Sequence, residues 1–358
     1  MKKKLLLFLC VLSGLCGQKN TDVLRNDLMR EKPSRGAVIA KKLVVFDMDG
    51  VIVDVSESYR DTVRQTARLF FKGARSWKQL PDPLFPLSDL ARVKQTGGLN
   101  NDWDLTCLVI NLLFKLVKGF VASGDPDPWS RHRTTIEQCD VASLAQYLIH
   151  TTDPVSALLE KDGKPDHEFI NGLFTGDVGS GNVIKQIFQE IYLGKDLFEV
   201  TYRIPARAYD GQGLIRKERL LVDRSVLERL AGSNILAIAT GRPRAEAESP
   251  LDAFGIRKYF SVVYTLDDCI EEEKRILKRQ KKKVSLSKPH PFMLDKIGAA
   301  QKNESSGFFY VGDMPDDMVA ASRSATGFKA IGILVSAPDK NSLKQELVKS
   351  GADYIVED

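Results

Sequence analysis

The sequence predicts an α/β protein with a doubly wound parallel sheet and a long helical insertion after the first strand. Short, continuously apolar segments end in polar or glycine residues, as buried parallel strands do. Helical patterns lie between most of these segments, which is typical of strand–helix–strand units. One interval, residues 55–225, is too long for a single crossover and has several helical patterns, which indicates an inserted domain.

The first strand is expected where an apolar run ends at Asp47, just before an Asp-Gly turn. Four further strands are expected in the same manner: 234–242, 260–266, 308–314 and 330–336. Helical patterns separate the later ones: 245–255, 290–301 and 315–325. Ligands of such sheets bind beyond the carboxyl ends of the strands. We therefore expect a site where these strands end.

The interval after the first strand has three strong helical patterns: 56–71, 102–118 and 182–194. Residues 41–54 and 226–358 are accordingly expected to form the core domain, and residues 55–225 an α-helical domain inserted into it. Residues 18–40 are polar and are interpreted as a linker.

Residues 1–17 have a basic start followed by about a dozen mostly apolar residues, which is the anatomy of a signal peptide. The segment is short for a membrane span. One interpretation is an exported or envelope-associated protein, attached to the membrane through this segment. The other is a cytoplasmic protein whose true start lies near Met29.

The composition excludes several classes of protein. The 52 basic and 47 acidic residues are interspersed, so the net charge of +5 does not indicate a nucleic-acid surface. Five cysteines without a CxxC pair, and only four histidines, indicate neither a zinc cluster nor a disulfide framework. The charged run 271–283 is interpreted as a solvated helix.

Carboxylates follow the first strand in a pattern that suits phosphoryl transfer. Asp47 can attack phosphorus as a nucleophile, and Asp49, two residues on, can face the same cleft as general acid and base. A Mg²⁺ ion held by Asp47, the backbone carbonyl of Asp49 and Asp313 would offset these charges. Asp317, one helical turn later, is expected to orient this site or to bind the ion.

The later strand ends carry groups that suit a phosphate. Thr240 is expected to donate a hydrogen bond to the phosphoryl group, while Gly241 lets the backbone approach the ligand and Arg242 contributes to substrate binding. Lys288, between a serine and a proline, would place a positive charge on the phosphoryl group and on Asp47.

A glycine-rich segment, "GDVGSGNVIKQ" from residue 176, looks like a phosphate-binding loop. A Walker A loop needs Lys and Ser or Thr directly after its last glycine, whereas Gly181 is followed by Asn182 and Val183. The segment is interpreted as a loop that ends in a helix N-cap, and it predicts no kinase or ATPase.

The motifs "DMDGV", "TGR", "SKP" and "GDMPDD", in this order at successive strand ends, resemble the haloacid dehalogenase superfamily from residue 42 to the end of the chain. The resemblance implies a Rossmann-like core and, because the helices are inserted after the first motif, a C1 cap like that of subfamily IA and phosphoglycolate phosphatase. It implies a Mg²⁺-dependent phosphomonoester hydrolase with an aspartyl-phosphate intermediate. The proton donor Asp49 disfavours dehalogenation.

Two other functions stay open. A phosphomutase of the β-phosphoglucomutase type shares the same pair of aspartates, and spacing does not distinguish it from a hydrolase. A non-catalytic binding protein with this fold would typically lack a catalytic carboxylate or the lysine, and this chain retains them.

Substrate choice is expected to come from the cap. Asn100, Asn101 and Trp103 are either ligands of the leaving group or, respectively, helix caps and packing. Arg60, Arg64 and Lys94 suit a small anionic phosphomonoester or are solvated helix positions. Segments including 94–106 also resemble a hydrolase group linked to imidazole glycerol-phosphate dehydratase, which makes histidinol phosphate one candidate substrate. The oligomeric state is not predicted.

Overall fold

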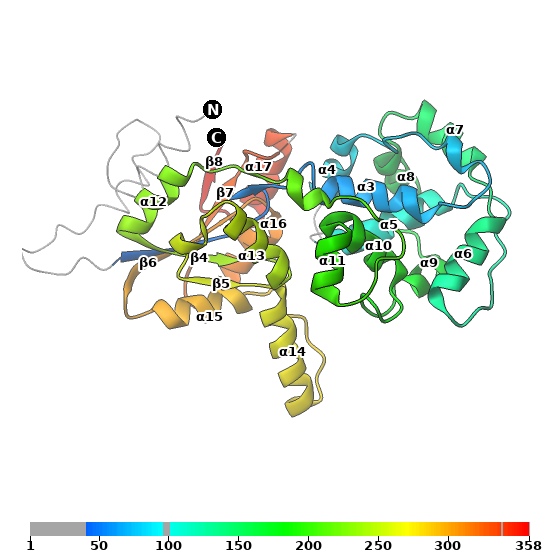
Figure 1. Cartoon of the computed structure of the whole chain (residues 1–358). Helices are drawn as coiled ribbons and strands as arrows, with labels where there is room; N and C mark the ends of the chain where they lie inside the picture. Colours follow the sequence, from blue (N-terminus) through cyan, green and yellow to red (C-terminus); the bar gives the residue numbers. More distant parts are fainter. Residues whose placement is uncertain (1–40, 96–100, 338, 358) are drawn as a thin grey trace, which may run out of the picture. The chain divides into compact units, whose positions relative to one another are not determined.

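The computed structural model describes residues 41–95, 101–337 and 339–357, which fold into two compact units (Figure 1). The first, here called the core, consists of residues 41–54 and 219–357, and the second, the cap, of residues 55–218. The signal-like segment and the linker lie outside the described residues. No helix in the described part of the chain is long and apolar enough to cross a membrane.

The core contains a six-stranded sheet in the order β5-β4-β1-β6-β7-β8, in which every neighbouring pair is parallel. Its strands are β1 (Lys41–Phe46), β4 (Asn234–Ala239), β5 (Val262–Tyr264), β6 (Ser305–Gly312), β7 (Lys329–Ile333) and β8 (Tyr354–Val356). This confirms the predicted parallel α/β fold. The sequence did not predict β8, because three residues are too short to establish a period.

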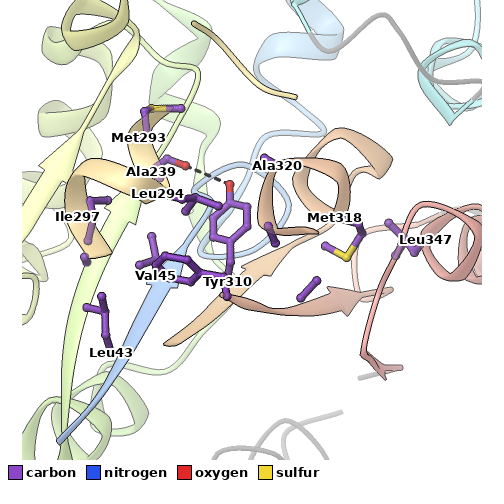
Figure 2. Packing of buried hydrophobic residues seen from close by; sticks show 14 of the residues in the cluster. Leu43, Val45, Ala239, Met293, Leu294, Ile297, Tyr310, Met318, Ala320 and Leu347 are labelled. Carbon is purple, nitrogen blue, oxygen red and sulfur yellow. Dashed lines mark hydrogen bonds between the residues drawn. The ribbon is translucent and has the colours of Figure 1, made fainter. Parts of the chain in front are cut away.

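The central strand β1 is buried on both faces, as its continuous apolar run predicted. On one face Leu43 and Val45 join a cluster with Met293 and Ile297 of α15 (Phe292–Gln301) (Figure 2). Tyr310 of β6 lies in the same cluster, and its hydroxyl oxygen lies 3.3 Å from the carbonyl oxygen of Ala239. A hydroxyl thus enters an otherwise apolar layer.

The remaining helices of the core alternate with the strands, and the predicted helical patterns 245–255 and 315–325 are among them. They are α12 (Arg224–Ser233), α13 (Arg244–Ala253), α14 (Leu266–Gln280), α16 (Pro315–Arg323) and α17 (Lys340–Lys349). The predicted solvated helix is the C-terminal part of α14, which extends away from the sheet (Figure 1). A capping box at Thr265 and Asp268 fixes where α14 begins.

A two-stranded ribbon marks the points where the chain leaves the core and returns to it. β2 (Val53–Asp54) pairs antiparallel with β3 (Arg219–Leu220), with Val53 opposite Leu220. The sequence placed the return to the core at residue 226, and the ribbon already lies in the core at residue 219. Strands of two residues carry no periodic signal.

The cap is helical. Its helices are α3 (Tyr59–Phe70), α4 (Leu87–Gln95), α5 (Asp102–Phe114), α6 (Pro128–Gln138), α7 (Ala142–His150), α8 (Pro154–Asp162), α9 (Glu168–Leu173), α10 (Val183–Leu193) and α11 (Lys195–Tyr202). Every residue of α5 from 105 to 114 is buried, so this apolar helix forms the centre of the cap. The rings of Tyr59 and Tyr192 stack with centroids 4.2 Å apart and join α3 to α10.

The buried His132 of α6 should make the cap sensitive to acid. Burial lowers its pKa to about 4, although the Phe70 carbonyl, 2.9 Å from Nε2, opposes this shift. An unfolded histidine titrates near 6.5, so unfolding takes up a proton between these values. The stability contributed by the neutral ring is complete above pH 6.5 and is lost as the pH falls towards 4. We expect a loss of about 3 kcal/mol.

Urea unfolding of the full chain at pH 7.0, 5.5 and 4.0 measures this loss. The free energy of unfolding of His132→Gln should rise by about 3 kcal/mol relative to that of the wild type between pH 7.0 and pH 4.0, because glutamine retains a polar group but does not titrate. His150→Gln, at an exposed position, is the matched control and should behave as the wild type does. Equal acid sensitivity in His132→Gln and wild type would contradict the assignment.

Candidate active site

The carboxyl ends of the three central strands bring the predicted residues together. Asp47 follows β1, Thr240 follows β4 and Asp313 follows β6, and β1 lies between the other two strands. The Asp47 N–H still donates to the carbonyl of Val311, at 2.8 Å, so the sheet fixes its backbone. All three residues are buried. The topology that was predicted from strand order therefore produces the expected cluster.

Lys288 connects the nucleophile candidate to the start of α16. Its Nζ lies 2.9 Å from Asp47 Oδ1 and 2.7 Å from Asp317 Oδ1. The three side chains are at most 8% exposed. Buried charges of this kind are tolerated only when they are paired. One ammonium thus compensates two carboxylates.

Asp317 uses both carboxylate oxygens within the core. Oδ1 accepts hydrogen bonds from Lys288 and, at 2.9 Å, from the Tyr310 hydroxyl, while Oδ2 accepts from the Met314 N–H at 3.0 Å. Sequence reasoning did not identify Tyr310. The signal available was a tyrosine, whose hydroxyl needs a partner when buried, in an otherwise apolar strand two residues before the glycine of "GDMPDD".

The same edge of the sheet has the donor set of a divalent metal site. Carboxylate oxygens of Asp47, Asp313 and Asp317 all lie within 4.8 Å of one another. Hard oxygen ligands of this kind fit Mg²⁺. Because both oxygens of Asp317 already accept hydrogen bonds, its geometry suits the orienting role better than that of a ligand.

Two neighbours of Asp313 shape this donor set. The Ser336 hydroxyl donates to Asp313 Oδ2 at 3.2 Å. Gly50 has φ +72°, and a Cβ on it would collide with the Asp313 carboxylate, so the turn after Asp49 needs glycine for conformation and for space. Ser336 was not predicted as a site residue, although it is a polar residue at the expected end of the fifth strand and the rule applied to the other strands would have found it.

Burial and crowding of like charges perturb these groups. Burial raises the pKa of Asp47 to about 8, with Lys288 opposing the rise and the carboxylates of Asp317, Asp49 and Asp313 adding to it. Burial alone would lower the pKa of Lys288, but the carboxylates of Asp317 and Asp47 hold it well above its usual range. The lysine therefore stays charged, and a cation beside Asp47 would favour its carboxylate form.

Asp49 is oriented by Arg242. Arg242 Nε and Nη2 lie 2.7 and 2.6 Å from Asp49 Oδ1, while Nη1 donates to the Glu246 carbonyl at 3.0 Å. The guanidinium is almost fully buried and the Asp49 side chain is 31% exposed. The sequence predicted Arg242 to bind substrate. In the structure its guanidinium contacts the carboxylate of Asp49, the general acid/base candidate.

The residues of the second motif leave room beside the nucleophile. Thr240 Oγ1 accepts the Arg242 N–H at 3.2 Å, so the hydroxyl keeps its own hydrogen for another acceptor. Apart from its two chain neighbours, no described residue has an atom within 4 Å of a Cβ built on Gly241. The backbone at Gly241 therefore has open space beside it, and ligand binding there stays a prediction.

The cap residues predicted to contact substrate have structural partners within the cap. Asn101 Oδ1 accepts the Trp103 N–H at 2.9 Å and so caps α5. Lys185 Nζ lies 3.8 Å from the centroid of the Trp103 ring, and Arg64 is bonded to Asp61. Asn100 and the side chain of Lys94 lie outside the described residues. Substrate binding by these residues stays a prediction.

Comparison with known proteins places this arrangement in a family. The model of haloacid dehalogenase-like hydrolases matches residues 41–324. The imidazoleglycerol-phosphate dehydratase of Phytophthora nicotianae is 24% identical over 305 residues, which are 85% of this chain and 45% of that protein. The chain thus spans about half the length of this relative.

One solved structure shows a similar fold, and a second was matched at a lower score. The X-ray structure of a structural genomics target has a TM-score of 0.56 and 22% identity, covering 88% of this chain and 95% of that one. A phosphatase from Thermococcus thioreducens has a TM-score of 0.47 and 21% identity, covering 86% and 99% respectively. Similarity at this level of identity concerns the fold.

Proposed function

Because the chain belongs to the haloacid dehalogenase-like hydrolase family, we propose that it is a Mg²⁺-dependent phosphatase acting on a small phosphomonoester through an aspartyl-phosphate intermediate. The observation that carries this proposal is the buried contact of Asp47 with Lys288 beside the Asp313 carboxylate. A nucleophilic carboxylate needs compensated charge when a phosphate dianion approaches it. This edge of the sheet has the residues for that compensation.

In this proposal an Asp47 carboxylate oxygen forms a bond to phosphorus as the bond to the leaving oxygen breaks. Asp49, protonated at this step, gives its proton to the leaving oxygen and later takes one from the water that hydrolyses the aspartyl phosphate. Arg242 keeps Asp49 in place, so it is a positioning residue. Thr240 donates its hydroxyl hydrogen to a phosphoryl oxygen.

Asp47, Asp313 and the backbone carbonyl of Asp49 are the groups that would hold Mg²⁺. When bound, the ion would neutralise the carboxylates and the phosphoryl charge. Asp317 then acts through Lys288, whose ammonium it holds against Asp47. This division of roles follows from the hydrogen bonds that already occupy Asp317.

The substrate class follows from the charges of the site and from the relatives. A single lysine and a divalent cation suit one phosphomonoester group. The curated relative that is named a dehydratase of imidazoleglycerol phosphate makes histidinol phosphate a candidate beside phosphoglycolate and sugar phosphates. The leaving group is recognised by the cap in this proposal, since the cap follows the nucleophile directly in the chain.

Phosphate release from a panel of phosphomonoesters, with Mg²⁺ or with EDTA, tests the proposal. We expect release only with Mg²⁺, and we expect Asp313→Asn to need at least about tenfold more Mg²⁺ because a charged ligand is lost. Asp252→Asn, at an exposed position on α13, is the control and should titrate with Mg²⁺ as the wild type does.

Release that persists in EDTA would contradict the metal requirement. If no panel member is hydrolysed by folded protein, conversion of hexose 1-phosphates should be measured next. Conversion without net phosphate release would replace the hydrolase with a phosphomutase.

A further inference from the structure

A small cavity in the cap has the features of a binding site of its own. It encloses about 180 Å³ beside α6 and α10 and is lined by Asp127, Pro128, Trp129, Gly179, Gly181, Gln186, Ile204, Pro205 and Arg207. Pockets for drug-sized ligands measure roughly 300–1,000 Å³. The cavity equals the volume of about six water molecules, which suits a small metabolite.

One residue that lines the cavity, Gln186, has an amide whose orientation is fixed by a hydrogen bond. Gln186 is 3% exposed, and its Nε2 donates to Glu190 Oε1 at 2.9 Å. The Glu190 carboxylate also accepts the N–H groups of Arg207, Ala208 and Tyr209, so the nitrogen of the Gln186 amide must face it. No described residue donates to Gln186 Oε1. Because Gln186 lines the cavity, this oxygen can accept a hydrogen bond from a ligand that has a donor.

The rim carries one charge of each sign beside an aromatic ring. The Arg207 guanidinium lies 5.7 Å from the centroid of the Trp129 ring. Asp127, at the start of α6, lies near enough to Arg207 for the guanidinium to lower the pKa of the carboxyl, although its hydrogen bond from the Ser130 N–H contributes most. The backbone carrying Arg207 is fixed, because Glu190 binds its N–H at 2.9 Å.

The glycine-rich loop forms a wall of the cavity but does not suit phosphate. The N–H groups of Asp177, Val178, Ser180 and Asn182 all donate to oxygens inside the loop. Phosphate-binding loops direct such groups at the ligand. Asn182 caps α10, as the sequence predicted. Gly179 and Gly181 both have positive φ, and a Cβ on Gly179 would press on Ile204.

We propose that this cavity binds a free amino acid, with the carboxylate on Arg207, the ammonium on Gln186 Oε1 and Asp127, and the side chain against Trp129. An ammonium supplies a donor for the Gln186 oxygen, and a carboxylate matches a guanidinium bidentately. A phosphate would place its negative charge beside the Asp127 carboxylate. The proposal concerns the cap alone and does not depend on the reaction of the core.

Thermal unfolding of the full chain with each of the twenty L-amino acids, and with inorganic phosphate, is the first measurement. Calorimetric titration of the amino acid with the largest shift then gives its affinity. We expect saturable binding of an amino acid at one site per chain. Arg207→Gln and Gln186→Met should each weaken it at least about tenfold, because each removes a hydrogen bond to a charged group.

Arg203→Gln is the matched control, since it makes the same change at an exposed position four residues away that does not line the cavity. It should leave the affinity unchanged. Two results would overturn the proposal. One is the absence of a shift with every amino acid, whether or not phosphate binds, and the other is an equal loss of affinity in Arg203→Gln. If Arg207→Gln does not fold, the affinity of Gln186→Met for the amino acid tests the proposal.

Discussion

Asp47→Asn is expected to lose phosphate release by at least about 10⁴-fold while the protein becomes more stable. The nucleophile is lost, because an amide does not form the aspartyl phosphate. Burial and three neighbouring carboxylates raise the pKa of Asp47 from 3.8 to about 8, so the folded protein favours the uncharged side chain. A neutral amide at this position removes that cost, and Lys288 keeps its contact with Asp317.

The pH dependence of unfolding tests whether the gain in stability comes from removing the buried carboxyl of Asp47. A carboxyl whose pKa is raised on folding stabilises the protein at low pH, and its contribution is lost as the pH rises through about 8. The stability advantage of Asp47→Asn should therefore grow between pH 4 and pH 8 in EDTA. Asp252→Asn should show no such trend. A less stable Asp47→Asn variant at pH 8 would contradict the unfavourable burial of Asp47.

Lys288→Met is expected to have the opposite effect on stability and a smaller, still large, loss of activity. It leaves the Asp47 and Asp317 carboxylates buried without their ammonium, and breaking a buried ion pair in this manner costs about 3–5 kcal/mol. Phosphate release should fall by at least about 10²-fold, because a charge directed at the phosphoryl group is removed. Urea unfolding and initial rates measure the two losses.

The double variant Lys288→Met with Asp317→Asn checks the origin of that loss. Removing one unpaired carboxylate should restore part of the stability without restoring activity. Lys302→Met, at an exposed position, should change stability by less than about 0.5 kcal/mol. If the double variant is as unstable as the sum of the single variants, the carboxylate repulsion is not the cause.

Much of the site was predictable from the arrangement of strands in a parallel sheet. Parallel strands end at the same edge of the sheet, so polar residues after each apolar run must meet there, and Asp47, Thr240 and Asp313 do. Lys288 was predicted from its motif, and its ammonium lies beside the Asp47 carboxylate, whose negative charge it compensates. Strand order and chain direction, which sequence patterns carry, were sufficient for these residues.

The remaining features depend on side-chain direction, which patterns do not carry. Arg242 belongs to the predicted motif, yet its guanidinium turns to Asp49 because that carboxylate emerges from the neighbouring strand. Tyr310 reaches Asp317 from the strand before "GDMPDD", and that strand was interpreted only as an apolar run. The ribbon β2–β3 and strand β8 were missed because two or three residues establish no period.

The β2–β3 ribbon allows the inserted cap to be exchanged for another segment. Asp54 and Arg219 lie opposite each other as the last paired residues of the ribbon before the cap begins and after it ends. The 164 residues between them, 55 to 218, are thus the loop of a β-hairpin. A two-residue Asn-Gly turn can close the same hairpin, so evolution or an engineer can exchange one insertion for another here without breaking a strand of the sheet. Modules of different specificity can then be grafted onto one unchanged chemical centre.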